Sequence, residues 1–185
     1  MLPVLFSGES NGESSAERWG LFSGNYLYLG GISQFGVVFS AMLRIVSARW
    51  GQSLCQLGEV ATLASFPLAI GGFLMIYNQG RSSLLYWVNE PATHAWLSEP
   101  LLLWRNLLAL LLFYTVSAFY CRWAAIADKT NGEAETVASH RASHCAYVAG
   151  SWVLIFFIVS NTFLAWDFGM MAIPHFHSTI FPIYV

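Results

Sequence analysis

Four long apolar stretches run through the chain, separated by short segments that carry most of the charge. A helix needs about 20 apolar residues to cross the roughly 30 Å hydrocarbon core of a bilayer. The stretches run from about Tyr26 to Val46, from Val60 to Tyr77, from Leu101 to Trp123 and from Cys145 to Trp166. They lack the alternation of an outer-membrane barrel strand. The pattern therefore predicts an all-α integral membrane protein, folded as an antiparallel four-helix transmembrane bundle.

The same pattern divides the chain into three regions. Residues 1–24 are rich in Ser, Gly and Glu, and we expect a flexible extramembrane tail. Residues 25–168 hold the bundle, and Pro67 predicts a kink in its second span. We expect residues 169–185 to form an outer-face turn and the start of a fifth helix. Because the chain stops where that helix should begin, we expect a fragment or a shortened relative.

Composition supports a membrane protein and excludes a nucleic-acid-binding one. Hydrophobic residues make up 56% of the chain and charged residues 10%, whereas a soluble domain carries about 25% charged residues. The eight Trp suit interfacial belts. The net charge of -2 provides no basic surface for phosphates.

Basic residues predict the orientation, because Lys and Arg concentrate on the cytoplasmic side. Five lie in the first and third connections, against two in the tail and the second connection. This asymmetry predicts that the first and third connections are cytoplasmic and that the N-terminus lies outside; the resemblance described below implies that the membrane is the bacterial inner membrane and that side the periplasm. Arg105 lies in the first turn of the third span, where we expect it to snorkel towards the interface.

Connections and cysteines offer little specific chemistry. The outer segment from Asn78 to Pro100 is aromatic and charged, which fits an interfacial helix or a docking surface for a peripheral subunit. The segment from Asp128 to Glu135 reads as an ordinary polar connection. The three Cys lack C-x-x-C spacing, so we interpret them as helix-face thiols and expect neither a metal site nor a redox cofactor in this chain.

The segment after the fourth span gathers ionisable groups beside the membrane. One carboxylate, two His and a Ser-Thr pair lie between Asp167 and Tyr184. Such groups are costly at that depth unless paired or hydrated, which favours proton handling or a polar contact with another subunit. The alternative is an interfacial turn in which Pro174 breaks the helix. His175 and His177 are two apart, so they would point to different faces of a helix and make a poor metal site.

This segment resembles a signature of NrfD-like (polysulfide reductase) membrane subunits, written D-W-x-M-S-L-E-P-H-W-x-S-T-I-F-G-x-Y. The similarity is to the second such subunit of alternative complex III, a bacterial quinol:electron acceptor oxidoreductase. It departs from the signature at Ile173, where the family has Glu, and at Pro182, where it has Gly. Weaker matches, which follow one another along the chain in the same order as in the family, extend the resemblance over residues 25–185. The matching residues are Asp167, Pro174, His175, Ser178 to Phe181, Ala48 to Trp50, Gly58 to Leu63 and Leu103 to Asn106.

The resemblance implies a membrane-integral subunit of a quinol-oxidising respiratory complex, structural and a candidate proton conductor. In that family electrons pass through haem and iron–sulfur cofactors of other subunits. The implied partners are a multihaem cytochrome, an iron–sulfur protein, a second NrfD-like subunit and lipid, with quinol or quinone bound by the complex. We expect no catalytic residue in this chain. The proton-path candidates are Asp167, His175, Glu59, Arg105 and Ser178.

Two other roles stay open at this point. The chain fits a quinone-site subunit of another reductase, in which His175 accepts a proton from quinol. It also fits a purely structural helper in a membrane supercomplex. Quinone bound near His175 would favour the first role. A continuous series of polar groups from Glu59 towards Asp167 would argue against the second.

The most specific expectation is a proton-handling pair of Asp167 and His175. Both are ionisable and lie at the outer end of the fourth span, and Pro174 can bend the chain to bring them together. A neighbouring carboxylate would raise the pKa of the imidazole and poise it near neutral pH. Ile173 weakens the case, because the Glu usual at its position would belong to the same relay.

Overall fold

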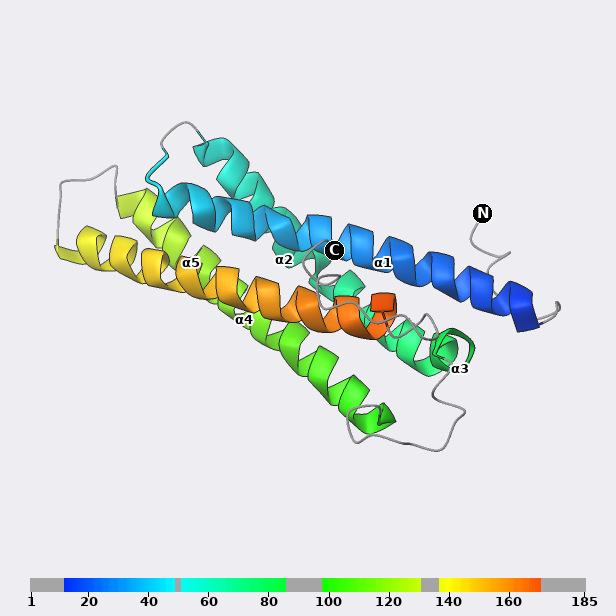
Figure 1. Ribbon diagram of the computed structural model, residues 1–185. Coiled ribbons are helices and arrows are strands. Elements are labelled where there is room, and N and C mark those ends of the chain that lie inside the picture. The colour runs from blue at the N-terminus through cyan, green and yellow to red at the C-terminus, as the bar shows by residue number, and fades with distance from the viewer. Residues whose placement is uncertain (1–11, 49–50, 86–97, 131–136, 171–185) are drawn as a thin grey trace.

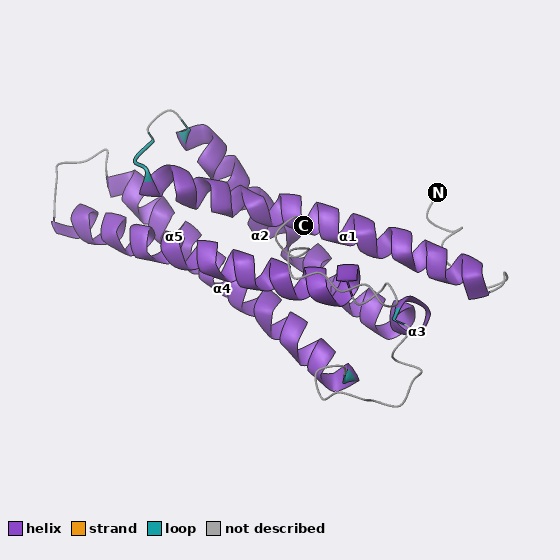
Figure 2. Ribbon diagram, viewed as in Figure 1, coloured by secondary structure: helices purple, strands orange, loops and turns teal. Residues whose placement is uncertain are grey.

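The computed structural model describes residues 12–48, 51–85, 98–130 and 137–170, and within them every regular element is a helix (Figure 2). Two short π-helical segments interrupt or extend the α-helices. The elements are α1 Gly12–Ile45, α2 Gln52–Met75, η2 Ile76–Gly80, α3 Arg81–Leu84, α4 Glu99–Thr130, α5 Val137–Leu164 and η5 Ala165–Met170.

Four of the described helical stretches are long and apolar enough to cross a membrane. They are Ser15–Ile45, Ser53–Leu84, Glu99–Lys129 and Ser139–Gly169. For the described residues, this confirms the predicted all-helical fold with four helices long and apolar enough to cross a membrane. Each helical stretch is longer than its predicted apolar segment, because the backbone hydrogen bonds of a helix continue past the point where its side chains become polar.

The first helix begins earlier than the sequence pattern predicts. It starts at Gly12, so residues 12–24 are helical and the prediction of a flexible tail is wrong for them. Trp19 packs against Gly80, where a Cβ would lie 2.7 Å from the indole ring, and against the ring of Phe22. This contact with the end of η2 favours helix over disorder, and composition alone does not reveal it.

The connections are shorter than predicted. Helix α2 continues through Pro67, and the helical stretch ends only at Leu84, inside the predicted outer connection. At the other end of the molecule, α4 extends to Thr130, so Asp128 belongs to a helix and not to a polar loop. The Ala residues before Asp128 favour helix, since Ala has the highest helix propensity.

Helices α1 and α2 approach each other closely at two glycines. A Cβ on Gly36 would lie 2.7 Å from the carbonyl oxygen of Gly58, and a Cβ on Gly58 would lie 2.6 Å from that of Gly36. Small residues allow the backbones of membrane helices to touch in this way. The contact brings polar side chains of α1 and α2 within hydrogen-bond distance on either side of it.

The centre of the bundle forms where α1, α4 and α5 meet. Tyr120 is fully buried, and a Cβ on Gly150 would lie 3.3 Å from its ring and 3.4 Å from Ala41. Phe113 is also fully buried, with its ring centroid 6.2 Å from that of Phe157. These contacts fix how α4 and α5 lie against α1.

Large apolar side chains cover the outside of the bundle. A soluble monomer rarely exposes a continuous apolar surface of this kind, whereas lipid or a membrane-embedded partner covers it without cost. The exposed set on α2 alone is Leu54, Leu57, Val60, Leu63, Phe66, Leu68 and Leu74.

Figure 1 shows two ends to the molecule. At one end, the last turns of α1 and α4 lie with the first turns of α2 and α5, and we call it the Arg44 end. At the other, which we call the Arg105 end, α4 begins and η5 ends.

Candidate functional site

Asp167 is held inside the protein at the Arg105 end. It lies in η5 and is 2% exposed. Arg105 donates from Nε to Asp167 Oδ2 at 3.2 Å and from Nη2 to Oδ1. The side-chain amide of Asn106 donates to Oδ2 as well. These three residues, the Asp167 cluster, set one cation against one anion.

Local structure fixes both sides of this cluster. The π-helical turn of η5 holds more residues per turn than an α-helix, which changes the direction in which Asp167 points. The amide of Asn106 also donates to the carbonyl of Leu102 at 3.0 Å, which orients it towards the carboxylate. The ring of Phe163 lies 5.9 Å from the Arg105 guanidinium, within the range of a cation–π contact.

The expectations for this region change accordingly. The predicted snorkelling of Arg105 is wrong, because its side chain is 8% exposed and pairs with Asp167 inside the bundle. A carboxylate at contact distance attracts the guanidinium more strongly than distant headgroups do. The proposed partner His175 and the candidate Ser178 lie outside the described residues, so the pairing of Asp167 with His175 stays a prediction.

Glu59 lies in a second group of polar residues towards the Arg44 end. It is 7% exposed, and Ser40 donates a hydrogen bond to its Oε1 at 2.5 Å. The Ser40 hydroxyl also lies 2.9 Å from the hydroxyl of Tyr120. Both partners are fully buried, so α1, α2 and α4 each contribute one polar side chain to this contact.

Arg44 connects Glu59 to a second carboxylate. Its guanidinium makes a bidentate pair with Asp128, with Nη1 donating at 3.0 Å and Nη2 at 2.7 Å. The same Nη2 lies 3.8 Å from Glu59 Oε1. At about 4 Å, opposite unit charges attract by roughly 4 kcal/mol at an effective dielectric constant of about 20. Ser40, Arg44, Glu59, Tyr120 and Asp128 together form the Glu59 cluster.

The two clusters differ in their charge balance. In the Asp167 cluster the charges of Arg105 and Asp167 cancel. In the Glu59 cluster one guanidinium faces two carboxylates, so the formal charge is negative when both are ionised. An unmatched charge inside a membrane protein is costly. The Glu59 cluster therefore has a reason to bind a proton, while the Asp167 cluster is already neutral.

Further hydrogen-bonded groups lie in the interior between the clusters. Thr62 donates to the carbonyl of Ser33 at 2.6 Å and accepts from the backbone N–H of Val37 at 3.0 Å. Ser65 and Tyr114 join their hydroxyls at 3.1 Å. These groups place polar atoms at successive levels of α1, α2 and α4.

Helix α5 adds a polar contact of its own to this series. The amide of Asn161 donates to Gln34 of α1 at 3.1 Å and to the carbonyl of Phe157 at 3.0 Å. Gln34 is 1% exposed, so the contact lies within the bundle. All four long helices therefore present polar side chains to the interior.

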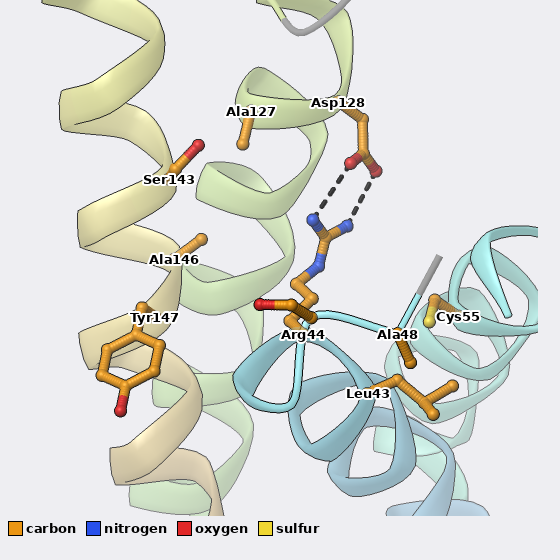
Figure 3. Close-up of a pocket in the computed structure, with 10 residues that line it drawn as sticks. Leu43, Arg44, Ala48, Cys55, Ala127, Asp128, Ser143, Ala146 and Tyr147 are labelled. Carbon is orange, nitrogen blue, oxygen red and sulfur yellow. Dashed lines mark hydrogen bonds and ion pairs between the residues drawn. The ribbon is translucent and has the colours of Figure 1, made fainter. Parts of the chain in front are cut away.

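A pocket of about 360 Å³ opens beside the Glu59 cluster at the Arg44 end. Figure 3 shows Arg44 reaching from the end of α1 to Asp128 on α4, with Ser143 on α5 across the opening. Cys55, one turn before Glu59 on α2, also lines it. The Arg44–Asp128 pair therefore lines the pocket, whereas Glu59 is buried and is not one of the lining residues.

Sequence reasoning found Glu59, Arg105 and Asp167 but missed their partners. Arg44 counted only towards orientation, and Asp128 was placed in a loop. The available signal was that Arg44 and Asp128 have opposite charges and lie near the ends of two spans at the same predicted membrane face. The contributions of Ser40, Tyr120 and Asn106 had no such signal, because isolated polar residues in apolar spans are common.

Metal and thiol chemistry receive no support from the described part of the chain. No group of three His, Cys, Asp or Glu residues there could hold a metal ion. Cys55 and Cys121 are buried and Cys145 is half-buried, all as free thiols. The buried carboxylates and hydroxyls of the two clusters are groups capable of acid–base chemistry.

Comparison with known proteins leaves the family assignment to the sequence motif. No protein-family model, curated protein or solved structure matches this chain. The resemblance to NrfD-like subunits therefore rests on the residues of the sequence motif.

Proposed function

We propose that this chain is a membrane-integral subunit of a quinol-oxidising respiratory complex similar to alternative complex III. In this proposal it forms an antiparallel four-helix bundle, contributes structure and binds protons in its interior. The observation that carries the proposal is the burial of two carboxylates, Glu59 and Asp167, inside spans whose outer surfaces are apolar.

The distribution of polarity supports a membrane location. Large apolar side chains are exposed on all four long helices, including Leu29, Leu68, Trp104 and Ile158. Charged side chains cost about 2.5–3.5 kcal/mol at the centre of a membrane helix, so they are retained there mainly for function or specific contacts. A bundle with this arrangement suits lipid outside and polar chemistry inside.

The polar interior supports proton handling. Carboxylates and hydroxyls bind and pass protons, and such groups occur at successive levels from the Glu59 cluster to the Asp167 cluster. The series weakens the case for a purely structural helper. In the Asp167 cluster the charges of Arg105 and Asp167 cancel, which favours a structural role at that end. We therefore assign the proton-binding role first to Glu59.

The sequence motif supports the respiratory context. Asp167 to Phe181 resembles the NrfD-like signature, and Asp167 occupies a buried position in the structure. The proposed partners are a multihaem cytochrome, an iron–sulfur protein and a second NrfD-like subunit. They would carry the redox cofactors in the bacterial inner membrane. The described residues supply no observation that favours a quinone site in this chain.

Purification from the native host tests the assignment. The chain, tagged and extracted in mild detergent, should copurify with haem- and iron–sulfur-containing subunits and with quinol oxidation activity. In the complex, Glu59→Gln should lower the ratio of protons moved to electrons transferred while quinol turnover persists. Purification of the chain with neither redox subunits nor quinol oxidation activity would overturn the respiratory assignment.

A pair of variants tests the proton-path candidates Asp167, at the Arg105 end, and His175. Asp167→Asn and His175→Ala should both be made in the assembled complex, with quinol turnover and proton release measured separately. Assembly with unchanged proton-to-electron ratios in both variants would restrict Asp167 to structure. A loss in Glu59→Gln alone would place the proton function at the Glu59 cluster.

A further inference from the structure

Arg44 stands between two carboxylates that differ in their surroundings. Asp128, held at 2.7 and 3.0 Å, lines the pocket, and its side chain is 17% exposed. Glu59, at 3.8 Å, has a side chain that is 9% exposed and accepts from Ser40. In this geometry Nη1 and Nη2 both donate to Asp128, and Nη2 lies too far from Glu59 Oε1 for a hydrogen bond, so Asp128 holds the guanidinium.

The distance to Glu59 is short enough to be closed by the side chain itself. An ordinary N–H···O contact is about 2.9 Å, so Arg44 Nη2 needs to move only about 1 Å towards Glu59 to complete it. Arginine side chains rotate about several bonds, and the Arg44 side chain is 20% exposed beside an open pocket. The backbone of the four helices can therefore stay in place while Arg44 changes partner.

We propose that Glu59 is a proton-binding site that exchanges with the pocket, with Arg44 alternating between Asp128 and Glu59. When Arg44 pairs with Asp128, Glu59 takes a proton from the pocket and becomes a neutral acid. When Glu59 releases that proton to water in the pocket, Arg44 moves to the carboxylate that forms. No bond other than those to the transferred proton is made or broken.

Charge neutrality is the reason for this alternation. With Glu59 protonated, the remaining charges of Arg44 and Asp128 cancel. With Glu59 ionised, the extra negative charge is closest to the only cation of the cluster. The other titratable groups that interact with Glu59 are Tyr120 and Cys121, both on α4 and both buried.

The use of this site in proton movement rests on the proposed function, but its protonation is measurable on the full chain alone. Loss of transmembrane proton movement with an intact Glu59 titration would contradict the proposed function and leave the site standing. Absence of a Glu59 titration would contradict the site, whatever the complex does.

Infrared difference spectra of the full chain in lipid vesicles test the first part. Acidification should produce the carbonyl bands of neutral carboxylic acids, and Glu59→Gln should remove the component that Glu59 contributes, the Glu59 band. Asp128→Asn should move the appearance of this band to lower pH, because Arg44 then remains with Glu59. Lys129 is exposed and follows Asp128 in the sequence, so Lys129→Gln also removes one charge. This control should leave the pH at which the band appears unchanged. An acid-induced spectrum that Glu59→Gln leaves unchanged would overturn the proposal.

Filling the pocket tests the route. Ser143 lines the pocket on α5, and Ser143→Trp should slow the appearance of the Glu59 band several-fold after a rapid pH jump. Ser143→Ala removes the same hydroxyl without filling the space and should leave the rate unchanged. Val148→Trp adds the same bulk at an exposed position of α5 outside the pocket lining, and serves as the second control. Equal rates in all three variants and the wild type would show that Glu59 does not exchange through the pocket.

Discussion

The guanidinium of Arg105 and the carboxylate of Asp167 form an ion pair inside the protein although 62 positions separate them in the chain. Their contact ties the beginning of α4 to the end of the fourth span. Both side chains are removed from solvent, and each is a charge partner of the other. The contact is therefore a natural place to test how the bundle is held together.

Arg105→Ala should destabilise the folded chain by about 3–5 kcal/mol, the usual cost of leaving one member of a buried pair alone. Thermal unfolding in detergent, followed by circular dichroism, measures the change. Arg122→Ala removes an exposed Arg from the same helix and should change stability by less than about 0.5 kcal/mol. The paired change Arg105→Leu with Asp167→Leu should cost much less than Arg105→Ala. Equal losses for Arg105→Ala and Arg122→Ala would contradict the buried pair.

Gly36→Ala should loosen the contact between α1 and α2. The added Cβ would lie 2.7 Å from the Gly58 carbonyl oxygen, which forces the two backbones apart at a cost of about 1–3 kcal/mol. Gly30→Ala is the matched control, because no atom lies within 4 Å of its Cβ position. That control should be neutral or gain up to about 1 kcal/mol from helix propensity. Comparing the stability of both variants to unfolding under the same conditions decides whether the backbones of α1 and α2 touch at Gly36 or only lie near each other.

Arg44→Ala should reduce folding yield and stability, because it leaves Glu59 and Asp128 without their shared cation. Removal of both negative charges in the same chain, by Glu59→Gln and Asp128→Asn, should restore most of the loss. If charge balance is the cause, Glu59→Gln or Asp128→Asn alone should restore less of the yield and stability of Arg44→Ala than both changes together. Size-exclusion profiles and thermal unfolding of the four variants provide the measurement, and a triple variant no better than Arg44→Ala would refute charge balance as the cause.

The two ends of the molecule should react differently with a membrane-impermeant maleimide in intact cells. The basic residues predict that a cysteine at Glu17, exposed in early α1, is labelled from outside. A cysteine at Lys129, exposed in the last turn of α4, should be labelled only after the membrane is opened. The native cysteines are first replaced by Ala. Labelling of the Lys129 position in intact cells would reverse the orientation.

Much of the architecture could be predicted from the sequence because a membrane span is a local property. In lipid, the backbone N–H and C=O groups of a run such as Leu101 to Trp123 find no water to bond with, so the run forms a helix that pairs them internally. Four such apolar runs therefore determine four helices long enough to span the membrane. Arg105 was recognisable because it lies within such a run, and Glu59 and Asp167 because each directly adjoins one, where an ionisable residue is exceptional. These conclusions need only the residues themselves and their distance from the ends of the run.

The partners of those residues were decided by the tertiary structure. Whether Arg105 reaches the interface or Asp167 depends on how α4 and the η5 turn face each other, and whether Arg44 meets Asp128 depends on α1 lying beside α4. Residue spacing along one helix does not contain that information. Apolar runs fix which segments cross the membrane, while contacts such as Gly36 with Gly58 fix the depth and rotation of each helix. Those two quantities place the charges together, so that Arg44 and Arg105 each meet a carboxylate of another helical element.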